Sequence, residues 1–316
     1  MEQGQGHTIL LTGATGFIGA AVFKQIIANG NLPIALLRPI SNTTRLQELK
    51  EYCYLTYETL QSPELVCKLQ KYRPKTLIHL AWHWRDATGK DSKGIYQVTD
   101  NLPLTIDSVK LAQAVGCTHW IGIGSRDEYG NVDHQVNESD PAIPTTVYGQ
   151  AKLSACWAAL SLCQAYGIWG SWIRTFGVYG PDDEPSRLIP YLIREMSFGE
   201  NPKLTKCEQI GDYLYIDDAA RGILSVAYAQ VPGIFNLGSG IAVSLKTVVE
   251  TTRKLINSQI NPNYGTIDYR PGQTMYSHAD ITKITNLTGW QPKVSLQEGL
   301  KLTVEEDQAK LYSARS

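Results

Sequence analysis

The stretch Thr12-Gly13-Ala14-Thr15-Gly16-Phe17-Ile18-Gly19 lies between an apolar run, Thr8–Thr12, and an amphipathic run, Phe17–Ala28. Its three glycines permit a tight turn, a close approach of the backbone to a pyrophosphate, and direct contact between helix and sheet. Backbone amides at the helix start would then face the anion, and the helix dipole would favour its charge. Because a strand precedes the glycines and a helix follows them, we interpret the stretch as a dinucleotide-binding loop and not as a plain turn. The predicted contacts are Gly13, Thr15, Gly16, Phe17, Ile18 and Gly19.

The same alternation of short apolar runs and amphipathic runs continues through the first half of the chain. Strands are predicted at Thr8–Thr12, Pro33–Leu37, Tyr52–Tyr57, Thr76–Ala81, Trp120–Ile123 and Ile168–Ile173. Helices are predicted at Phe17–Ala28, Thr44–Lys50, Pro63–Lys71, Leu102–Val115 and Tyr148–Tyr166. This rhythm requires crossover connections, so we expect an α/β fold with a doubly wound, Rossmann-type parallel sheet covered on both faces.

The rhythm breaks beyond Gly177, where turn-forming pairs such as Gly180-Pro181 and Glu184-Pro185 separate shorter segments. We expect a smaller C-terminal α+β substrate-binding lobe, with the chain crossing back once. The predicted dinucleotide-binding domain comprises residues 1–175 and a return segment at about 212–237. The predicted lobe comprises residues 176–211 and 238–316.

Composition excludes several classes of partner. The 316 residues carry a formal net charge of -1, which gives no electrostatic reason to expect nucleic acid or an anionic membrane. No apolar run is long enough to span a bilayer. The six cysteines are scattered without a Cys-x-x-Cys pair, which is typical of reduced thiols in a cytoplasmic protein without a metal site. We therefore expect a cytoplasmic protein, and a homodimer is compatible with these features.

The end of the second predicted strand indicates which dinucleotide binds. NAD sites usually place an acid there to accept from the ribose hydroxyls. Here the strand ends at Arg38, and no acid follows before Glu48. A guanidinium can bind a 2′-phosphate through two hydrogen bonds, with Ser41 and Arg45 nearby. This favours NADP(H) over NAD(H), which stays possible; the alternative is that Arg38 stacks on adenine or lies in solvent.

Tyr148 and Lys152 are spaced i, i+4, which places both side chains on one helical face, one turn apart. A phenol is a weak acid or base at neutral pH, and a neighbouring ammonium lowers its pKa. Tyr-x-x-x-Lys alone is common by chance. After a glycine loop and five predicted strands, we interpret it as a catalytic pair and not as a surface helix turn.

With these motifs, the chain resembles the extended short-chain dehydrogenase/reductase family, in its nucleotide-sugar epimerase/dehydratase/reductase group. The resemblance extends over nearly the whole chain. The matching segments are Thr12–Gly19, His79-Leu80-Ala81, Asn101, Ser125, Glu128-Tyr129-Gly130, Tyr148–Lys152, Arg174–Pro181, Asp212–Asp218, Phe235–Gly238, Arg270-Pro271-Gly272 and Gly289–Pro292.

The resemblance implies how the cofactor is bound. Leu80 and Ala81 would line its adenosine–ribose side, and Lys152 would bind the nicotinamide ribose. The segment from Phe176 to Val178 would pass beside the nicotinamide. Asn101 is a further cofactor-site candidate, with capping of the helix as an equal alternative.

It also implies the roles of the reacting groups. Tyr148 would exchange a proton with the sugar oxygen while hydride moves to or from the nicotinamide. Ser125 would hydrogen-bond the same oxygen, although a serine at a strand end can also be satisfied locally. Arg270 would bind the substrate diphosphate.

Three departures from the family pattern narrow the reaction. Sugar 4,6-dehydratases place an Asp–Glu pair directly after the Ser/Thr position, where this chain has Arg126 and Asp127. Arginine cannot act as an acid, so dehydration is not expected and Arg126 becomes a substrate-binding candidate. The arginine usual before Asp212 is also missing, which makes Arg187 or Arg194 candidates for a phosphate contact. The third departure is Gly177, where the family has Asn.

Trp82-His83-Trp84-Arg85 follows the fourth predicted strand, where the resemblance places the reacting sugar. Trp82 could pack on a hexose and His83 could bond a hydroxyl; the alternative is a covering loop. We favour an NADP(H)-dependent reductase of a nucleotide-linked 4-keto-6-deoxyhexose, because the chain has Arg38 and lacks the Asp–Glu pair of the dehydratases. The runner-up is a 4-epimerase with retained NAD. A non-catalytic NADP(H)-binding redox regulator is a minor alternative, because a sensor needs no proton donor.

Overall fold

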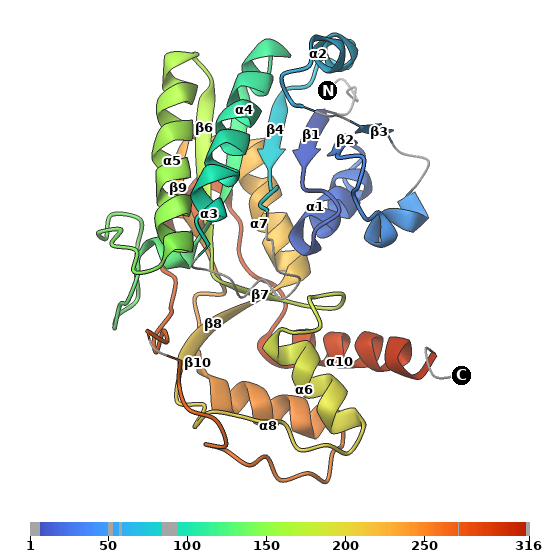
Figure 1. The fold of residues 1–316 in the computed structure, drawn as a ribbon, viewed down its shortest axis with the longest axis vertical. Coiled ribbons are helices and arrows are strands. Elements are labelled where there is room, and N and C mark those ends of the chain that lie inside the picture. Colours follow the sequence, from blue (N-terminus) through green and yellow to red (C-terminus); the bar gives the residue numbers. More distant parts are fainter. Residues whose placement is uncertain (1–6, 50–52, 57–58, 84–93, 271, 314–316) are drawn as a thin grey trace.

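The computed structural model describes residues 7–49, 53–56, 59–83, 94–270 and 272–313. Within these residues, a seven-stranded parallel sheet has the order β3-β2-β1-β4-β5-β6-β9 (Figure 1). Its strands are β1 (Thr8–Thr12), β2 (Leu32–Leu37), β3 (Cys53–Thr56), β4 (Thr76–His79), β5 (His119–Ser125), β6 (Trp169–Thr175) and β9 (Gly233–Leu237). The order reverses between β1 and β4, so the predicted doubly wound Rossmann-type sheet is confirmed.

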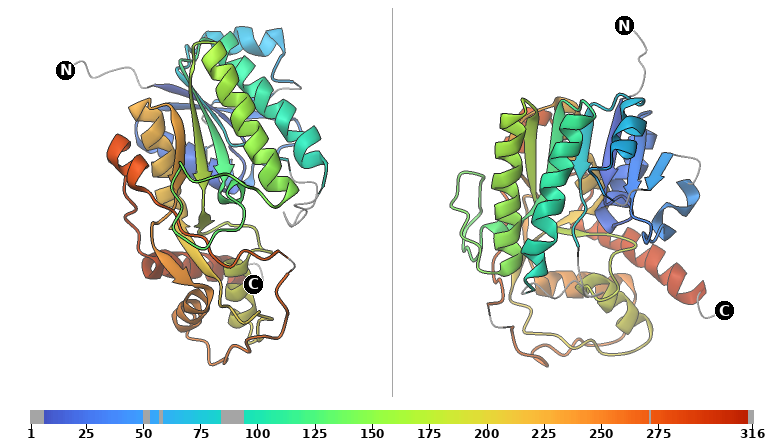
Figure 2. Two further views of the ribbon diagram at one scale, coloured as in Figure 1. Left: turned by 90° about the vertical axis from the view of Figure 1, so that its left-hand side faces the viewer. Right: turned by 45° about the horizontal axis from the view of Figure 1, so that its top comes forward.

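Alternation along the strands sends apolar side chains into two separate cores. Ile34, Leu10, Leu77 and Trp120 form one cross-strand row on one face, where every member is buried. The row on the opposite face packs into the other core and comprises Ala35, Leu11, Ile78 and Ile121. Figure 2 shows the two helical layers that cover these faces. The first core is covered by α2 (Pro63–Gln70), α4 (Asn101–Ala114) and α5 (Val147–Ala165), and the second by α1 (Phe17–Ala28), α7 (Ile216–Ala229) and α9 (Thr282–Thr288).

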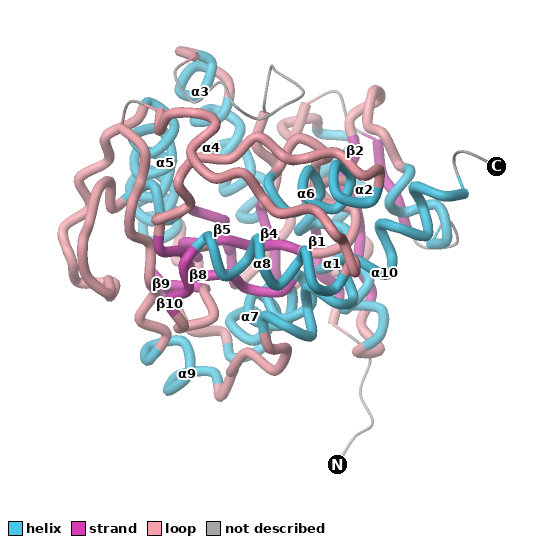
Figure 3. Tube along the Cα trace, turned by 90° about the horizontal axis from the view of Figure 1, so that it is seen from below, coloured by secondary structure: helices cyan, strands magenta, loops and turns pink. Residues whose placement is uncertain are grey.

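A smaller sheet of order β10-β8-β7 lies at one end of the main sheet (Figures 1 and 3). It comprises β7 (Gly177–Tyr179), β8 (Ile210–Tyr215) and β10 (Ala242–Ser244), with α6 (Leu188–Ser197), α8 (Leu245–Leu255) and α10 (Leu296–Ser313) around it. Strand β8 pairs with β7 and β10 in the smaller sheet. The chain then returns to the main sheet, beginning with α7 and β9. The division into two domains stays a prediction.

Some boundaries differ from those predicted. Thr44–Leu49 is a 3-10 helix, η1, because so short a segment forms few α-helical hydrogen bonds. Lys50, Tyr52 and Tyr57, at predicted element ends, lie outside the described residues. A further short helix, α3, spans Tyr96–Thr99. In the part of the chain that the structure describes, no helix has the length and apolarity to cross a bilayer.

Strand β5 continues two residues beyond its predicted end and delivers Ser125 to the edge of the sheet. Two glycines interrupt the apolar pattern here for a packing reason. A Cβ at Gly122 or Gly124 would collide with the indole of Trp172. The glycines therefore admit a large buried ring against the strand, and they do not end it.

Candidate active site

The glycine loop connects β1 to α1. Gly13 has a φ of 72°, and a Cβ there would lie 2.6 Å from the backbone nitrogen of Ala81. A Cβ at Gly19 would collide with the carbonyl oxygen of Gly13. Gly16 is exposed and has more room. Gly13 and Gly19 therefore shape the loop against the end of β4, while Gly16 leaves space for a ligand.

The first turn of α1 suits an anion. Gly16 precedes the helix and offers no side chain to cap the amides of Phe17 and Ile18. Thr15 accepts a hydrogen bond through its carbonyl from Arg45 Nη1 at 3.4 Å. These open amides, beside an arginine, fit the diphosphate of a dinucleotide.

Arg38 is the first residue after β2 and is exposed. Its backbone amide donates to Ser41 Oγ at 3.0 Å, which orders the turn. Its guanidinium Nη1 lies 2.8 Å from His83 Nε2, so His83 meets Arg38 at this end of the site. The predicted sugar contact of His83 stays a prediction. Trp84 and Arg85 lie outside the described residues.

Three predicted catalytic residues lie together. Helix α5 begins after Thr146, whose Oγ1 accepts from the Gly149 amide at 3.0 Å. Lys152 is 5% exposed, and its Nζ lies 6.0 Å from the Tyr148 ring centroid. Ser125, at the end of β5, hydrogen-bonds the Tyr148 side chain. A phenol, a hydroxyl and an ammonium thus converge at one point.

A buried ionic network supports Ser125. Glu128 and Arg174 are 0% and 2% exposed, and Arg174 Nε donates to Glu128 Oε2 at 2.8 Å. Glu128 Oε1 accepts from the Ser125 amide and from Trp172 Nε1, each at 2.9 Å. Ser125 Oγ also accepts from the Asp127 amide at 3.2 Å, which completes a capping box. No supporting role was predicted for Glu128, although Ser-x-x-Glu is the sequence signature of a capping box.

Burial dominates the proton equilibria of the pair. It raises the pKa of Tyr148, as does the charge of Asp127, while the Ser125 hydrogen bond opposes the rise. It lowers the pKa of Lys152 to about 7, against the opposing charge of Glu128. The expected lowering of the Tyr148 pKa by the ammonium is therefore outweighed here. The phenol is protonated at neutral pH, as a proton donor must be.

Arg126 is turned inward. Its side chain is 13% exposed, and Nη1 donates to Asp127 Oδ1 at 3.1 Å and to Thr274 Oγ1 at 2.8 Å. Nη2 donates to the Gly130 carbonyl at 2.7 Å. These partners hold the Ser125 turn against the segment that contains Thr274. A role of Arg126 in substrate binding stays a prediction.

The other candidate arginines differ in position. The Arg187 side chain is 63% exposed and lies 3.4 Å from Asp183. Arg194 pairs with Glu195 at 2.9 Å. Arg270 is exposed at a turn closed by the Gln273 amide. The substrate contacts predicted for Arg187, Arg194 and Arg270 stay predictions.

Three further predicted positions are buried. Asn101 accepts from the His83 amide at 2.5 Å and donates to the His83 carbonyl at 3.2 Å, so it fixes the loop after β4 and does not cap its helix. Phe176 and Val178 pack into hydrophobic clusters. Between them, a Cβ at Gly177 would lie 2.5 Å from the Asp212 carbonyl oxygen. A side chain at this position would therefore require the paired strands β7 and β8 to shift.

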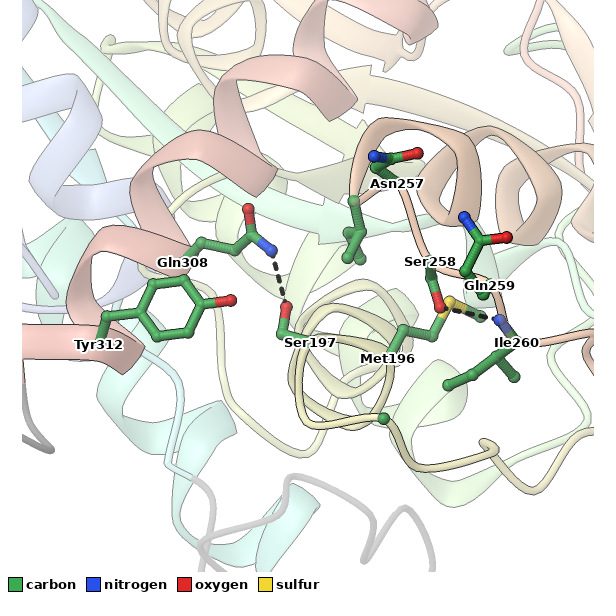
Figure 4. Close-up of a pocket in the computed structure, with 10 residues that line it drawn as sticks. Met196, Ser197, Asn257, Ser258, Gln259, Ile260, Gln308 and Tyr312 are labelled. Carbon is green, nitrogen blue, oxygen red and sulfur yellow. Dashed lines mark hydrogen bonds between the residues drawn. The ribbon is translucent and has the colours of Figure 1, made fainter.

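Two cavities lie apart from the catalytic pair. One, of about 440 Å³, is open to solvent and lined by α6, α10 and the segment after α8 (Figure 4). The Gln308–Ser197 hydrogen bond of 2.9 Å crosses it. Of the described residues that line it, none is charged, so it offers no counter-charge to a diphosphate. The other, of about 650 Å³, lies between the loop after η2 (Arg126–Glu128) and the segment at Met275.

Comparison with known proteins gives one consistent result. The model of the NAD dependent epimerase/dehydratase family matches residues 9–238. The chain is 27% identical to CDP-abequose synthase of Salmonella muenchen over 303 residues, 93% of this chain and 95% of the relative. It is 26% identical to UDP-glucuronate 4-epimerase of Thermodesulfobacterium geofontis over 93% and 94% of the two chains.

Solved structures agree. UDP-glucose 4-epimerase of Thermotoga maritima, determined with UDP-glucose, superposes with a TM-score of 0.81 at 27% identity and covers 96% of this chain and 99% of its own. With the glycine loop and the Ser125, Tyr148 and Lys152 cluster, these matches confirm the enzyme class expected from the sequence. The chain belongs to the NAD dependent epimerase/dehydratase family, and its relatives include nucleotide-sugar epimerases and dehydratases of the extended short-chain type.

Proposed function

We propose that this chain is an NADP(H)-dependent reductase of a nucleotide-linked 4-keto-6-deoxyhexose, active in deoxysugar or polysaccharide biosynthesis. The observation that carries this choice is Arg38, a cation directly after β2 where NAD sites usually hold an acid. Net reduction needs a cofactor that is released and replaced, which NADPH suits. Epimerisation instead recycles hydride on a retained NAD. The relatives named for CDP- and UDP-linked sugars support the substrate class.

The surroundings of Arg38 support a phosphate contact. Its guanidinium is exposed and donates to His83 Nε2, which orients it at this end of the site. Arg45, from η1, extends from the glycine loop to the carbonyl oxygen of Asp182, 2.9 Å from its Nη2. Two guanidinium groups thus lie near the predicted adenosine end of the cofactor, where a 2′-phosphate adds negative charge.

The catalytic cluster suits proton delivery to a ketone. When bound, the reduced dinucleotide supplies hydride to the carbonyl carbon. Tyr148, kept protonated by burial, donates its proton to the carbonyl oxygen. Ser125 donates a hydrogen bond to the same oxygen and stabilises its developing charge. Lys152 would bind the nicotinamide ribose. One hydride and one proton convert the keto group to a secondary alcohol.

Dehydration is disfavoured by the residues after Ser125. The position that holds an acid in dehydratases is Arg126, whose guanidinium already bonds Asp127, Thr274 and Gly130. A permanently charged arginine cannot deliver a proton during loss of water.

The second candidate function is that of a nucleotide-sugar 4-epimerase. Relatives and solved structures named as epimerases match the chain over nearly its full length. Such an enzyme would use the same Ser125, Tyr148 and Lys152. It would, however, first need a base to remove a proton from an alcohol, whereas a reductase needs only a proton donor. A non-catalytic redox regulator is less favoured, because it needs none of the three.

Calorimetric titration of NADPH and NADH into the wild type and Arg38→Asp tests the proposal. Charge-assisted contacts to the 2′-phosphate contribute about 1.5–3 kcal/mol, so the wild type should prefer NADPH roughly ten- to more than a hundredfold. Arg38→Asp should lose that preference, because a carboxylate repels the phosphate. Lys301→Asp on α10 makes the same charge change at an exposed position and should keep it. Equal wild-type affinities, or tightly held NAD in the purified protein, would move the assignment to epimerase.

A further inference from the structure

Trp82 contacts both members of the catalytic pair. It lies three residues beyond the end of β4. The Lys152 Nζ lies 3.6 Å from the centroid of its ring. Its ring also meets the Tyr148 ring edge-on, with centroids 6.0 Å apart and an interplanar angle of 87°. The face of the indole therefore covers the ammonium, and Trp82 bounds the site beside the phenol.

The indole is anchored on its far side. Its Nε1 donates to Gln97 Oε1 at 2.7 Å, and Gln97 on α3 is fully buried. Gln97 in turn donates through Nε2 to the Tyr96 hydroxyl at 3.2 Å. The two hydrogen bonds between Asn101 and the His83 backbone hold the chain at the next residue. Moving the indole would break its bond to a buried amide, a costly change in a dry environment.

The Lys152 ammonium also contacts a backbone carbonyl, and charged groups on neighbouring elements act on it. Nζ donates to the Ile123 carbonyl at 2.8 Å. Of the titratable groups that act on it, Glu128 on η2 raises its pKa, while burial lowers the pKa to about 7. Tyr148 lies along the same helix, and the Lys152 charge in turn helps to lower the pKa of His79 on β4. An indole face attracts a cation and also excludes water from it.

We propose that Trp82 is a positioning residue for Lys152: its anchored indole fixes the ammonium beside Tyr148 and shields it from water. The inference uses the catalytic pair of the proposed function, but it does not depend on whether the reaction is reduction or epimerisation. The proposed role differs from the packing on a hexose that was predicted for Trp82 from the sequence. The residue acts on the reaction through the lysine.

The first test uses the indole as a reporter of the lysine's charge. The fluorescence of the wild type minus that of Trp82→Phe isolates the emission of Trp82 from that of the other tryptophans. Measured against pH, this difference should show a step near the Lys152 pKa of about 7. The matched difference between Lys152→Met and the Lys152→Met/Trp82→Phe double variant should lack the step. A step that persists without Lys152 would overturn the inference.

The second test measures the lysine through NADPH affinity as a function of pH, with NADH as a second probe. Wild-type affinity should fall as the pH rises through the Lys152 pKa, because the ribose loses its charged donor. Trp82→Ala loses the attraction of the indole for the cation but also admits water, and because burial is the dominant influence on the Lys152 pKa the midpoint of this fall should rise. Trp82→Phe keeps an aromatic face and should stay near the wild type. A merely structural role would weaken binding equally at every pH, and an unmoved midpoint in Trp82→Ala refutes the proposal. Neither test involves a sugar. Failure of the Trp82 proposal is therefore distinguishable from failure of the reductase assignment.

Discussion

The substitution Glu128→Ala tests the network that holds Ser125 in place. It leaves the Arg174 guanidinium, 2% exposed, without its carboxylate, and it removes the acceptor of the Ser125 amide and of Trp172 Nε1. Removing one partner of a buried ion pair costs about 3–5 kcal/mol. Each orphaned donor adds roughly 1–3 kcal/mol, although such terms do not sum. Against a typical total stability of about 5–15 kcal/mol, the loss is large.

Glu128→Gln provides a graded comparison. The amide keeps the shape and one acceptor oxygen, but it loses the charge that faces Arg174, so its loss of stability should be intermediate. Glu64→Ala removes an exposed glutamate paired with Lys68 and should barely change the unfolding midpoint. Urea unfolding followed by circular dichroism gives all the differences. If Glu128→Ala fell within about 1 kcal/mol of the wild type, or Gln cost more than Ala, the network would not act as described.

The remaining predictions concern the reacting groups. Tyr148→Phe removes the proton donor and keeps the ring, so kcat should fall by a factor of order 10²–10⁴ with cofactor affinity nearly kept; turnover within about threefold of the wild type would remove Tyr148 from the mechanism. Lys152→Ala should weaken both turnover and dinucleotide binding in a calorimetric titration, because one residue serves both. If binding held while turnover collapsed, the ribose-binding role would be wrong. Ser125→Ala should reduce kcat by about 10²–10³ with unchanged cofactor affinity, and an unchanged kcat would exclude its contact with the reacting oxygen.

Local patterns predicted the fold and the Tyr148–Lys152 pair because both depend on short spacings. The turn glycines, strand alternation and the i, i+4 pair are read within a few residues of one another. The predicted helix Phe17–Ala28 and strand Thr8–Thr12 match the observed elements. The predicted strand ended before Gly124, although β5 continues through this glycine, which makes room for the distant Trp172.

The missing parts of the site depend on contacts between distant segments. Gln97 carries no local signal, and only its hydrogen bond to Trp82 shows its role. Arg174 was recognised as part of a motif, but its ion pair spans 46 residues to Glu128. The protonation of Tyr148 also follows from burial, which spacing does not give. Sequence spacing therefore identified Tyr148 and Lys152, the family resemblance indicated Ser125, and tertiary packing determined the electrostatic state of these groups.

Transfer of a labelled hydride tests the central claim, net reduction of a nucleotide-linked keto sugar, most directly. The purified protein is incubated with NADPH deuterated at its hydride position and a nucleotide-linked 4-keto-6-deoxyhexose, and the product is analysed by mass spectrometry and NMR. We predict one deuterium on the former carbonyl carbon of each product molecule and one NADPH oxidised for each, with both lost in Tyr148→Phe. Interconversion of 4-hydroxyl stereoisomers without consumption of NADPH, and without deuterium in the sugar, would contradict the account.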